Sequence, residues 1–435
     1  MNTLLLRPTD VLFFRDGRPM SGSLSGHGAA WPLPTVTNAA LHAALHRASI
    51  TDVHAHRRGR SGDYSNQTKD RDRKFGSLTT AGPFPVVDGE WLFPRPLDVG
   101  PAAEGQSPTC PTYFPVVADL PHPPSSLAKP LLYPVANSQD PSKMAPEPWW
   151  NLAAWHQYLG TRPNDAPVKF FHDSDFANTE STFGIGIDPI TGTQDKKQFY
   201  SAHYLRLREN ARLGLLAEAI DKVDNDKNKT RDLIPALFST ENSIIIGGQQ
   251  RICTTECSND ATIPLPIGQL TNFPEHHGKF LVKWVLLTPA IFPAINFHSG
   301  GWLPSWIDIS GQVQLLDGPG KNFVKRHGGT PGQRIPATLV AALTGKPLVV
   351  TGYALDSGLE DRKPGPKPTL LAVPPGSAYY FECSSAAAAE SLATALNWHG
   401  NSTVITTIRN RRSTLMGEKG FGLGVCSNWM PHQIS

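Results

Sequence analysis

The sequence predicts an α+β fold in two halves, in which strands and helices follow one another in the same order. Apolar runs of strand length recur along the 435 residues, an alanine-rich helical segment occurs in each half, and proline and glycine interrupt both. Each half is compatible with the order βαββαβ of ferredoxin-like (RRM-like) domains. We place the first domain at residues 1–265 and the second at residues 275–435.

The composition limits the class of protein. A chain of 435 residues is too long for one ordinary core, so two domains are expected. The 40 proline and 38 glycine residues predict abundant irregular structure. Lysine and arginine exceed aspartate and glutamate by only three (40 against 37), so a nucleic-acid surface would require local clustering of basic residues.

The first half opens with a strand and a helix. Residues 3–7 form an apolar run of strand length, and residues 34–47 carry the alanine and leucine pattern of a helix. Thr35 or Thr37 could cap that helix, because threonine oxygens accept hydrogen bonds from the first-turn amides.

A long irregular insertion is predicted in the first domain, at about residues 50–180. Residues 54–77 are rich in lysine and arginine with almost no apolar side chain, which predicts a mobile basic loop. Proline recurs every few residues from Pro94 to Pro148, which predicts few regular elements there.

The first domain regains regular structure after the insertion. We predict a helix at 152–159, strands at 183–188 and 198–207 around a turn, a strand or helix at 213–220, a helix at 231–239, and a strand at 244–246 that passes through a glycine turn into another strand.

The second domain repeats this plan after the proline-containing stretch 263–274. We predict strands at 280–287 and 348–354, a strand pair or bulged strand at 370–373 and 377–383, a helix at 384–398, and a last strand after Phe421. The first helix of this half has no clear pattern between residues 303 and 345, except at 337–343.

The five cysteines form no regular framework, and with no apparent signal peptide they predict a reduced, cytoplasmic protein. Cys253 and Cys257 are four apart, without a second pair or a nearby histidine. We therefore place them on one buried strand face and predict no metal site. No apolar run approaches the roughly 20 residues that span a bilayer, so no membrane partner is predicted.

Two arginines follow the first strand in Arg15-Asp16-Gly17-Arg18. A turn at Asp16-Gly17 would place both guanidinium groups on one rim, where they could grip phosphate. The alternative interpretation is a surface ion pair of Arg15 with Asp16 and a solvated Arg18. His27 lies among spaced glycines just before the helix at residue 34, where backbone amides could meet an anion.

A second candidate segment is Gly247-Gly248-Gln249-Gln250-Arg251. Its glycines would let the backbone approach a ligand closely, with Arg251 as a clamp. A plain hairpin or bulge explains the glycines equally well.

The third candidate is Lys419-Gly420-Phe421-Gly422, with basic residues upstream at Arg409, Arg411 and Arg412. The segment matches neither phosphate-binding glycine fingerprint, so we predict no nucleotide cofactor. An aromatic residue between glycines and a lysine suits base stacking, which contributes roughly 1–3 kcal/mol per base. A phenylalanine packed under a sheet, with glycines for close strand approach, is the alternative.

No catalytic motif is recognisable. The chain has no Gly-x-Ser-x-Gly, no His-Glu-x-x-His and no paired-carboxylate segment, so we predict that it is not an enzyme. The alternative is a metal-independent, RNA-processing endoribonuclease, which would need a histidine base. His27, His42 and His46 are the candidates. A protein-binding scaffold without RNA affinity is the third hypothesis.

The ordered series of segments resembles the RAMP-superfamily third subunit of type III-B CRISPR (Cmr) effector complexes, which binds the 5′ handle of the guide RNA (crRNA). The matching segments span most of the chain, in order: 8–19, 33–36, 82–84, 92–98, 183–188, 199–207, 247–251, 288–291, 350–353, 372–382 and 420–424.

The resemblance implies two ferredoxin-like domains without catalysis. It implies a subunit that holds the crRNA handle, with the large Palm-domain subunit and the backbone RAMP subunits as neighbours. The RNA-facing residues carried over by matching motif are Arg15, Arg18, Gly247, Gly248, Gln249, Arg251, Gly420, Phe421 and Gly422. His27 and Lys419 join this set from the residue patterns alone.

The chain departs from the family pattern at several positions. Asn38 stands where glycine is usual, and His42 and His46 lie on a helix that often carries arginine. Glu180-Ser181-Thr182 occupies a place where arginine is common, and Gly247-Gly248-Gln249-Gln250 replaces the more usual Gly-Gly-Glu.

Overall fold

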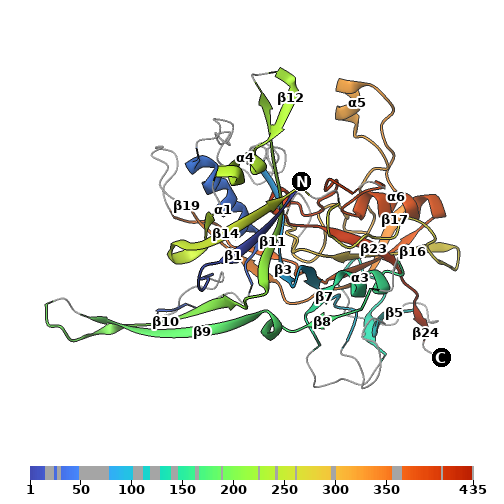
Figure 1. Ribbon diagram of the computed structural model, residues 1–435. Coiled ribbons are helices and arrows are strands. Elements are labelled where there is room, and N and C mark those ends of the chain that lie inside the picture. Colours follow the sequence, from blue (N-terminus) through green and yellow to red (C-terminus); the bar gives the residue numbers. More distant parts are fainter. Residues whose placement is uncertain are drawn as a thin grey trace.

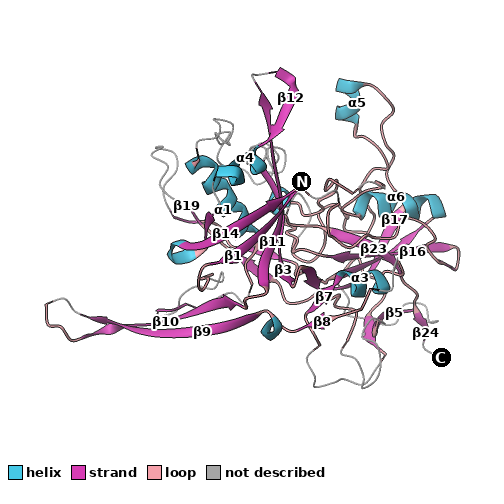
Figure 2. Cartoon of the chain, viewed as in Figure 1, coloured by secondary structure: helices cyan, strands magenta, loops and turns pink. Residues whose placement is uncertain are grey.

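The computed structural model describes residues 1–14, 24–26, 31–48, 78–100, 111–117, 128–138, 146–161, 166–187, 190–223, 226–240, 243–259, 262–294, 300–354, 365–402 and 405–433. Within them the chain is a mixed α/β protein with mostly antiparallel sheets and few helices (Figures 1 and 2). The predicted mixture of strands and helices is confirmed at this level.

The largest sheet has nine strands and contains the N-terminal strand in its interior. The order is β13-β14-β1-β11-β3-β4-β7-β8, and β12 pairs with β11. The strands are β1 (Asn2–Pro8), β3 (Leu78–Val87), β4 (Glu90–Pro94), β7 (Trp149–Asn151), β8 (Phe170–Phe171), β11 (Ala211–Val223), β12 (Asp226–Asp232), β13 (Ser243–Ile246) and β14 (Arg251–Ser258).

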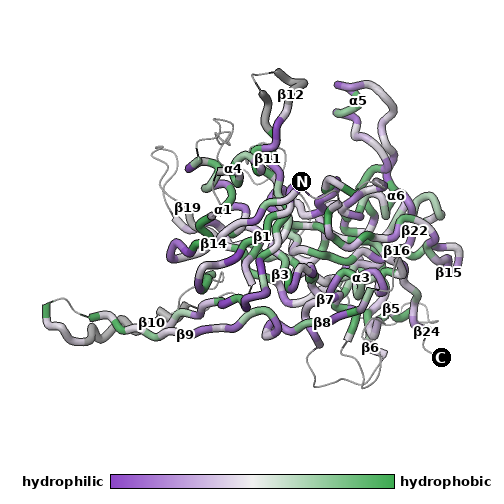
Figure 3. The backbone as a smooth tube through the Cα atoms, in the orientation of Figure 1, coloured by the Kyte–Doolittle hydropathy of each residue, from purple (hydrophilic) through white to green (hydrophobic). Residues whose placement is uncertain are grey.

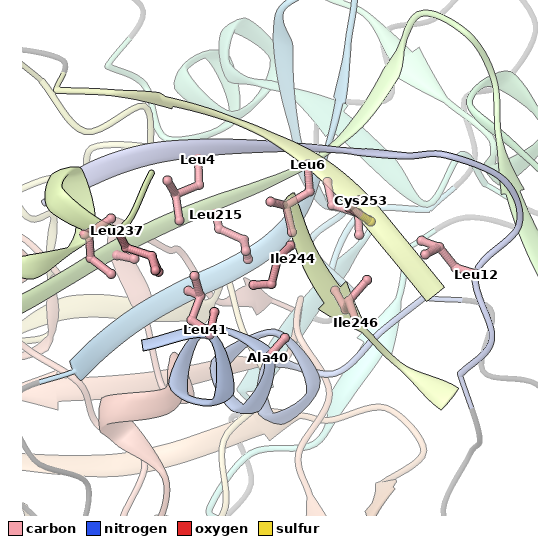
Figure 4. Close-up of a cluster of buried hydrophobic side chains, with 14 of the residues drawn as sticks. Leu4, Leu6, Leu12, Ala40, Leu41, Leu215, Leu237, Ile244, Ile246 and Cys253 are labelled. Atoms are coloured by element: carbon pink, nitrogen blue, oxygen red, sulfur yellow. The ribbon is translucent and has the colours of Figure 1, made fainter. Parts of the chain in front are cut away.

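Helices α1 (Pro34–Arg47) and α4 (Leu233–Thr240) supply residues to the core of this sheet. Figure 4 shows Leu41 and Leu237 from these helices close to Leu4 and Leu6 of β1 and Leu215 of β11. Their burial follows from the alternation along β1, which turns every second residue toward the same face.

The predicted strand at 3–7 and helix at 34–47 are confirmed, but the predicted threonine cap is wrong. The helix begins at Pro34, so Thr35 and Thr37 lie inside its first turn, and the Thr37 hydroxyl donates to the Pro34 carbonyl (3.2 Å). Proline suits that first position because its fixed φ matches the helix and it has no amide to satisfy.

The second large sheet has five strands, in the order β15-β16-β22-β17, with β23 paired to β16. They are β15 (Glu275–His276), β16 (Lys279–Leu286), β17 (Ala337–Leu343), β22 (Ala378–Cys383) and β23 (Gly424–Asn428). Helix α6 (Ala386–Leu396), capped by the Ser385 hydroxyl, packs its Leu392 and Leu396 into the core of this sheet.

Two predictions in this half are wrong. Residues 337–343 form the strand β17 and not a helix, because a short apolar run fits a fully buried strand as well as a buried helix. Residues 370–372 and 378–383 are not paired with each other: β21 (Leu370–Ala372) pairs with β18 (Leu348–Val350), while β22 joins the five-stranded sheet. The strand predicted at 348–354 is split between β18 and β19 (Tyr353–Ala354).

The remaining elements are short or project from the body. The hairpin of β9 (Ala177–Ile187) and β10 (Gln194–Leu207) extends far to one side (Figure 1). The others are β2 (Leu24–Gly26), β5 (Tyr113–Val117), β6 (Val135–Asn137), β20 (Gly365–Pro366), β24 (His432–Gln433), α3 (Leu152–Tyr158), α5 (Lys321–His327), and the 3-10 turns η3 (Asp173–Asp175), η4 (Gly248–Gln250) and η5 (Gly417–Lys419).

The predictions between residues 50 and 258 largely hold where the structure describes the chain. The helix at 152–159, the two strands around the turn, the helix near 231–239 and the glycine turn between strands are confirmed, and 213–220 is a strand. The described parts of the proline-rich stretch 94–148 contain only β5 and β6 as regular elements. The basic loop 54–77 lies outside the described residues.

The two large sheets share a core. One buried cluster joins Phe84 and Leu216 of the first sheet to Val285, Tyr380 and Leu423 of the second half. Figure 3 shows hydrophobic residues concentrated in this central region. Side chains from each sheet are therefore buried against side chains of the other.

A buried ion pair also links the two sheets. The Lys283 ammonium on β16 lies 2.6 Å from the Asp98 carboxylate, which follows β4, and the Tyr158 hydroxyl donates to the same carboxylate (2.7 Å). Because both charged side chains are almost fully buried, each depends on the other for compensation.

Cys253 and Cys257 lie on one face of β14, as predicted: Cys253 is fully buried, and Cys257 is half-buried against the same core. Among the described residues, no group of three or more histidine, cysteine or acidic side chains is placed to hold a metal ion. No helix in the described part of the chain is long and apolar enough to cross a membrane.

Candidate nucleic-acid interface

The Gly247 turn between β13 and β14 fits tightly against the chain's own backbone. The Gly248 amide donates to the Phe13 carbonyl (2.8 Å), and a Cβ at Gly247, whose φ is +73°, would lie 2.6 Å from that same oxygen. The glycines therefore serve a close intramolecular approach in a hairpin, which was the alternative interpretation. The Gly248 amide is not available to a ligand.

The turn positions four side chains that we call the Tyr204 cluster: Phe13, Tyr204, Gln249 and Arg251. Leu12 and Leu205 exchange backbone hydrogen bonds (2.8 Å each), which place the base of β10 beside the segment after β1. The Phe13 and Tyr204 rings consequently lie 5.4 Å apart, measured between centroids.

Polar contacts hold the cluster together. The Gln249 amide donates from Nε2 to the Tyr204 hydroxyl (3.1 Å) and accepts from that hydroxyl at Oε1 (3.2 Å). The Arg251 guanidinium donates to Gln249 Oε1 (2.9 Å) and lies 5.2 Å from the centre of the Tyr204 ring. An aromatic ring, an amide and a guanidinium are thus presented together, and such groups can stack on a base and bind a phosphate.

Two carboxylates balance the positive charge beside the cluster. Arg206 forms ion pairs with Glu180 and with Asp10 (3.0 Å), and Asp10 also lies 3.5 Å from Arg251. Because Arg206 is 43% exposed and Asp10 54%, these pairs contribute little stability. Their effect is to hold the guanidinium groups in place, where a phosphate could replace a carboxylate as partner.

The contacts also bias ionisation at the cluster. The hydrogen bond from Gln249, aided by the nearby Arg251, lowers the pKa of Tyr204. The hydrogen bonds to Glu180 and Asp10 raise the pKa of Arg206, which keeps this guanidinium charged at any physiological pH.

The glycine loop near the C-terminal end gives a different result. Phe421 is fully buried in a cluster with Ile291, Val350, Ala372 and Leu415. The interpretation that its ring stacks on a base is therefore corrected to the alternative, a phenylalanine packed under the sheets.

The neighbouring glycines explain this packing. At Gly420, whose φ is +101°, a Cβ would lie 3.1 Å from the Ala81 Cα, and at Gly422, whose φ is +78°, it would overlap the Ser413 backbone. Burial lowers the pKa of the half-buried Lys419. These residues hold two segments of the chain close together.

The upstream arginines are structural as well. Arg411 donates to the carbonyls of Thr80 (2.7 Å) and Gly417 (3.0 Å), and Arg412 donates to the Ala395 carbonyl (2.6 Å). Burial lowers the pKa of both to about 10, so they remain charged at neutral pH. Only Arg409 of the three has an exposed side chain.

Several predicted site residues cannot be placed. Arg15, Arg18 and His27 lie outside the described residues. His42 is half-buried on α1, and the side chain of His46, on the same helix, is also outside the described part. The structure therefore brings together Gln249 and Arg251 from the predicted set, with Gly247 and Gly248 as their support.

A cavity of about 410 Å³ lies apart from the cluster, beside α3, β4 and β7. Its polar lining groups are already engaged: Asn151 accepts from the Ala154 amide (3.0 Å), His156 accepts from the Ile267 amide (3.4 Å), and Glu90 pairs with Lys169 (2.9 Å). The rest of the lining is mainly apolar.

Five residues of this region were not predicted from the sequence as site residues: Asp10, Phe13, Glu180, Tyr204 and Arg206. One signal was present, because Tyr204 and Arg206 are two apart on a strand and therefore share a face. Their partners lie far along the chain, so the pairing itself has no local signal.

Comparisons with known proteins give one match that covers nearly the whole chain. A family model described as "CRISPR-associated protein (Cas_Cmr3)" matches residues 4–429. A comparison with curated protein sequences finds no significant match.

Solved structures give distant matches. A chain of a type III-B Cmr-beta complex bound to cognate target RNA and AMPPnP is 15% identical, with a TM-score of 0.36 over 87% of this chain and 86% of that one. A chain of the Csm3–Csm4 subcomplex of a type III-A CRISPR-Cas interference complex is 9% identical, with a TM-score of 0.33 over 87% of this chain and 92% of that one.

Proposed function

The chain belongs to the Cas_Cmr3 family of CRISPR-associated proteins, and on this premise we propose that it is a non-catalytic, RNA-binding subunit of a type III-B CRISPR ribonucleoprotein. In this role it holds the 5′ handle of crRNA in antiviral defence. It joins the large Palm-domain subunit to the backbone RAMP subunits.

The observation that supports the RNA role best is the Tyr204 cluster. Stacking on a partly exposed ring is tolerant of base identity, whereas the Gln249 amide, which exchanges hydrogen bonds with Tyr204, keeps one Nε2 hydrogen for a base edge. Arg251 supplies a charged donor beside them. Arg15, which follows Phe14 directly in the sequence, and Arg18, three residues further on, remain proposed RNA contacts on the basis of the sequence alone.

The proposal includes the division into two ferredoxin-like domains, residues 1–265 and 275–435. The strand order β14-β1-β11-β3 in the first sheet and β23-β16-β22-β17 in the second supports it. In both, the first and third strands of the βαββαβ plan lie at the centre and the second and fourth at the edges. The helix after the first strand of the second domain has no packed equivalent among the described residues.

Crosslinking tests the handle role. The complex is co-expressed with a crRNA that carries a photoreactive base in the 5′ handle, using the wild type, Tyr204→Ala, Arg251→Ala and the control Arg212→Ala. Arg212 is a half-buried arginine on β11 that, among the described residues, donates to the carbonyls of Glu209 (2.6 Å) and Ala211 (2.9 Å). We expect handle crosslinks to Tyr204-containing or Arg251-containing peptides, a loss of handle affinity of about 1–3 kcal/mol in Tyr204→Ala, and no change in the control.

Other outcomes separate the alternatives. Crosslinks confined to the spacer would make the chain a filament subunit, and no crosslinks at all would favour a protein scaffold. Cleaved crRNA products that disappear on substitution of His27, His42 or His46 would establish the endoribonuclease instead.

A further inference from the structure

A second surface element belongs to the second half of the chain. Residues 317–333 leave the second half of the chain as a loop that carries α5 at its tip, and we call this segment the α5 loop. Figures 1 and 2 show α5 clear of the body, at the opposite end of the view from the β9–β10 hairpin. Every residue of α5 except the half-buried Val324 is exposed.

Hydrogen bonds close the neck of the α5 loop. The Asp317 amide donates to the Gln333 carbonyl (2.9 Å), the Gln333 amide donates to the Asp317 carboxylate (2.6 Å), and Leu316 pairs with Arg334 in an antiparallel bridge. Gly318 and Gly332 let the two sides touch, because a Cβ at Gly318 would lie 3.1 Å from the Gly332 Cα. The two ends of the loop therefore meet at Asp317 and Gln333, and the residues between them project from the body.

The tip is cationic and carries an aromatic platform. Lys321, Lys325 and Arg326 make no ion pair with any described residue, and residues 318–333 contain no acidic side chain. Phe323 is 57% exposed, and the imidazole of His327 lies 4.5 Å from its ring centre. A helix of seven residues with no buried side chain is marginal in water, so α5 contributes little to the stability of the fold.

We propose that the α5 loop is a second RNA-contacting site, which grips a single-stranded segment by phosphate contacts and by stacking on Phe323. Uncompensated lysine and arginine around one exposed ring match surfaces that bind single-stranded nucleic acid. Protein–protein interfaces are instead depleted of lysine at their centre, and a single exposed phenylalanine offers little apolar area for one. The proposal rests on the proposed function only in taking RNA as the polyanion.

The test compares full-length variants in equilibrium binding of a labelled single-stranded RNA over a series of salt concentrations. In one variant Lys321, Lys325 and Arg326 are changed to Gln, and in the matched control Arg212, Lys279 and Lys346 are changed to Gln. If each tip residue contacts a phosphate, the slope of log K against log salt falls in magnitude by about 2. The control keeps the wild-type slope, and Phe323→Ala weakens binding at every salt concentration.

A deletion variant guards against misfolding as an explanation. Replacing residues 318–332 with Asn-Gly joins two positions that are already hydrogen-bonded, so this variant keeps the wild-type unfolding curve and loses the same RNA contacts.

An unchanged affinity and salt slope in the tip variant would overturn the proposal. Loss of a protein subunit from the co-expressed complex, with RNA affinity intact, would overturn it in favour of an acidic protein partner. Handle crosslinking depends on Tyr204 and Arg251 whereas the salt slope depends on the tip, so either proposal can fail while the other stands.

Discussion

His399 is a buried imidazole that the fold keeps neutral. It is 1% exposed, its Nε2 accepts a hydrogen bond from the Gly268 amide (3.1 Å), and burial lowers its pKa from the usual 6.5 to about 4. Between these two values the unfolded chain binds a proton at this residue and the folded chain does not. This contribution to stability is complete above pH 6.5 and is lost progressively as the pH falls toward 4.

We therefore expect His399→Gln, whose amide oxygen can still accept from Gly268, to make the unfolding free energy less dependent on pH. In the wild type this histidine contributes a loss of up to about 1.4 kcal/mol per pH unit between pH 6.5 and 4. Urea unfolding at pH 7.5 and pH 5 measures the difference, and His276→Gln, at a half-buried surface position, is the control. Equal pH dependence in the wild type and His399→Gln would contradict the assignment.

The candidate site could be predicted from the sequence only in part, for reasons visible at single residues. Gln249 and Arg251 were found because glycines mark a turn in the sequence itself. Tyr204 was missed because its partner Gln249 lies 45 residues away, and only tertiary structure brings them together. The sequence did not decide whether Phe421 stacks on a base or packs in the core. Its burial depends on segments such as 348–350 and 370–372, which lie far from it in sequence.

At the scale of elements, the glycine loop before β23 packs so closely against neighbouring backbone that Gly422 leaves no room for a side chain. The Arg412 amide donates to the Gly422 carbonyl (2.7 Å), and the Gly422 amide donates to the Pro289 carbonyl (2.7 Å). An added methyl group at Gly422 would overlap the Ser413 backbone, so one of these hydrogen bonds would have to break.

We expect Gly422→Ala to destabilise the protein by at least about 2 kcal/mol more than Gly160→Ala. Both glycines have positive φ (+78° and +70°), so the cost of the backbone conformation is shared, but a Cβ at Gly160 meets nothing within 4 Å. Urea midpoints of the two variants, with m-values to check two-state behaviour, give the comparison. Similar midpoints would mean that the loop can move to make room.

Elements with a local signal could be predicted, and elements defined by pairing could not. The helix at 34–47 has helix propensity and a proline at its first position, the Ala-rich helix α6 is capped by Ser385, and the turn of the β9–β10 hairpin contains Gly192. The strand β17 was taken for a helix because its apolar run has no clear period, and its place beside β22 settles the matter. Distant partners also explain why β21 and β22 do not pair with each other: β21 pairs with β18, whereas β22 pairs with β16 and β17.

At the scale of the whole molecule, the shared core predicts cooperative unfolding. The Lys283–Asp98 pair, the hydrogen bond from Arg411 to Thr80 and the mixed cluster around Phe84 and Tyr380 all join the two halves. Separating the halves would expose this apolar surface and leave both members of a buried ion pair without a partner.

We therefore expect one calorimetric unfolding transition, with the calorimetric enthalpy equal to the van't Hoff enthalpy, although the chain has the length of two domains. Asp98→Ala should lower the midpoint of that single transition, because Lys283 would remain buried without its carboxylate. Two resolved transitions, only one of them shifted by Asp98→Ala, would show that the halves unfold independently.

The central position of β1 has a consequence for synthesis on the ribosome. Its partners in the sheet are Leu213–Ala217 of β11 and Cys253–Ser258 of β14, more than 200 residues later in the chain. At bacterial or eukaryotic translation rates, the nascent strand waits on the order of tens of seconds for both neighbours. Leu4 and Leu6 of β1 share the finished core with Leu41 and Leu45 of α1, which is translated soon after them, so this helix can shield the strand while the polypeptide is still growing.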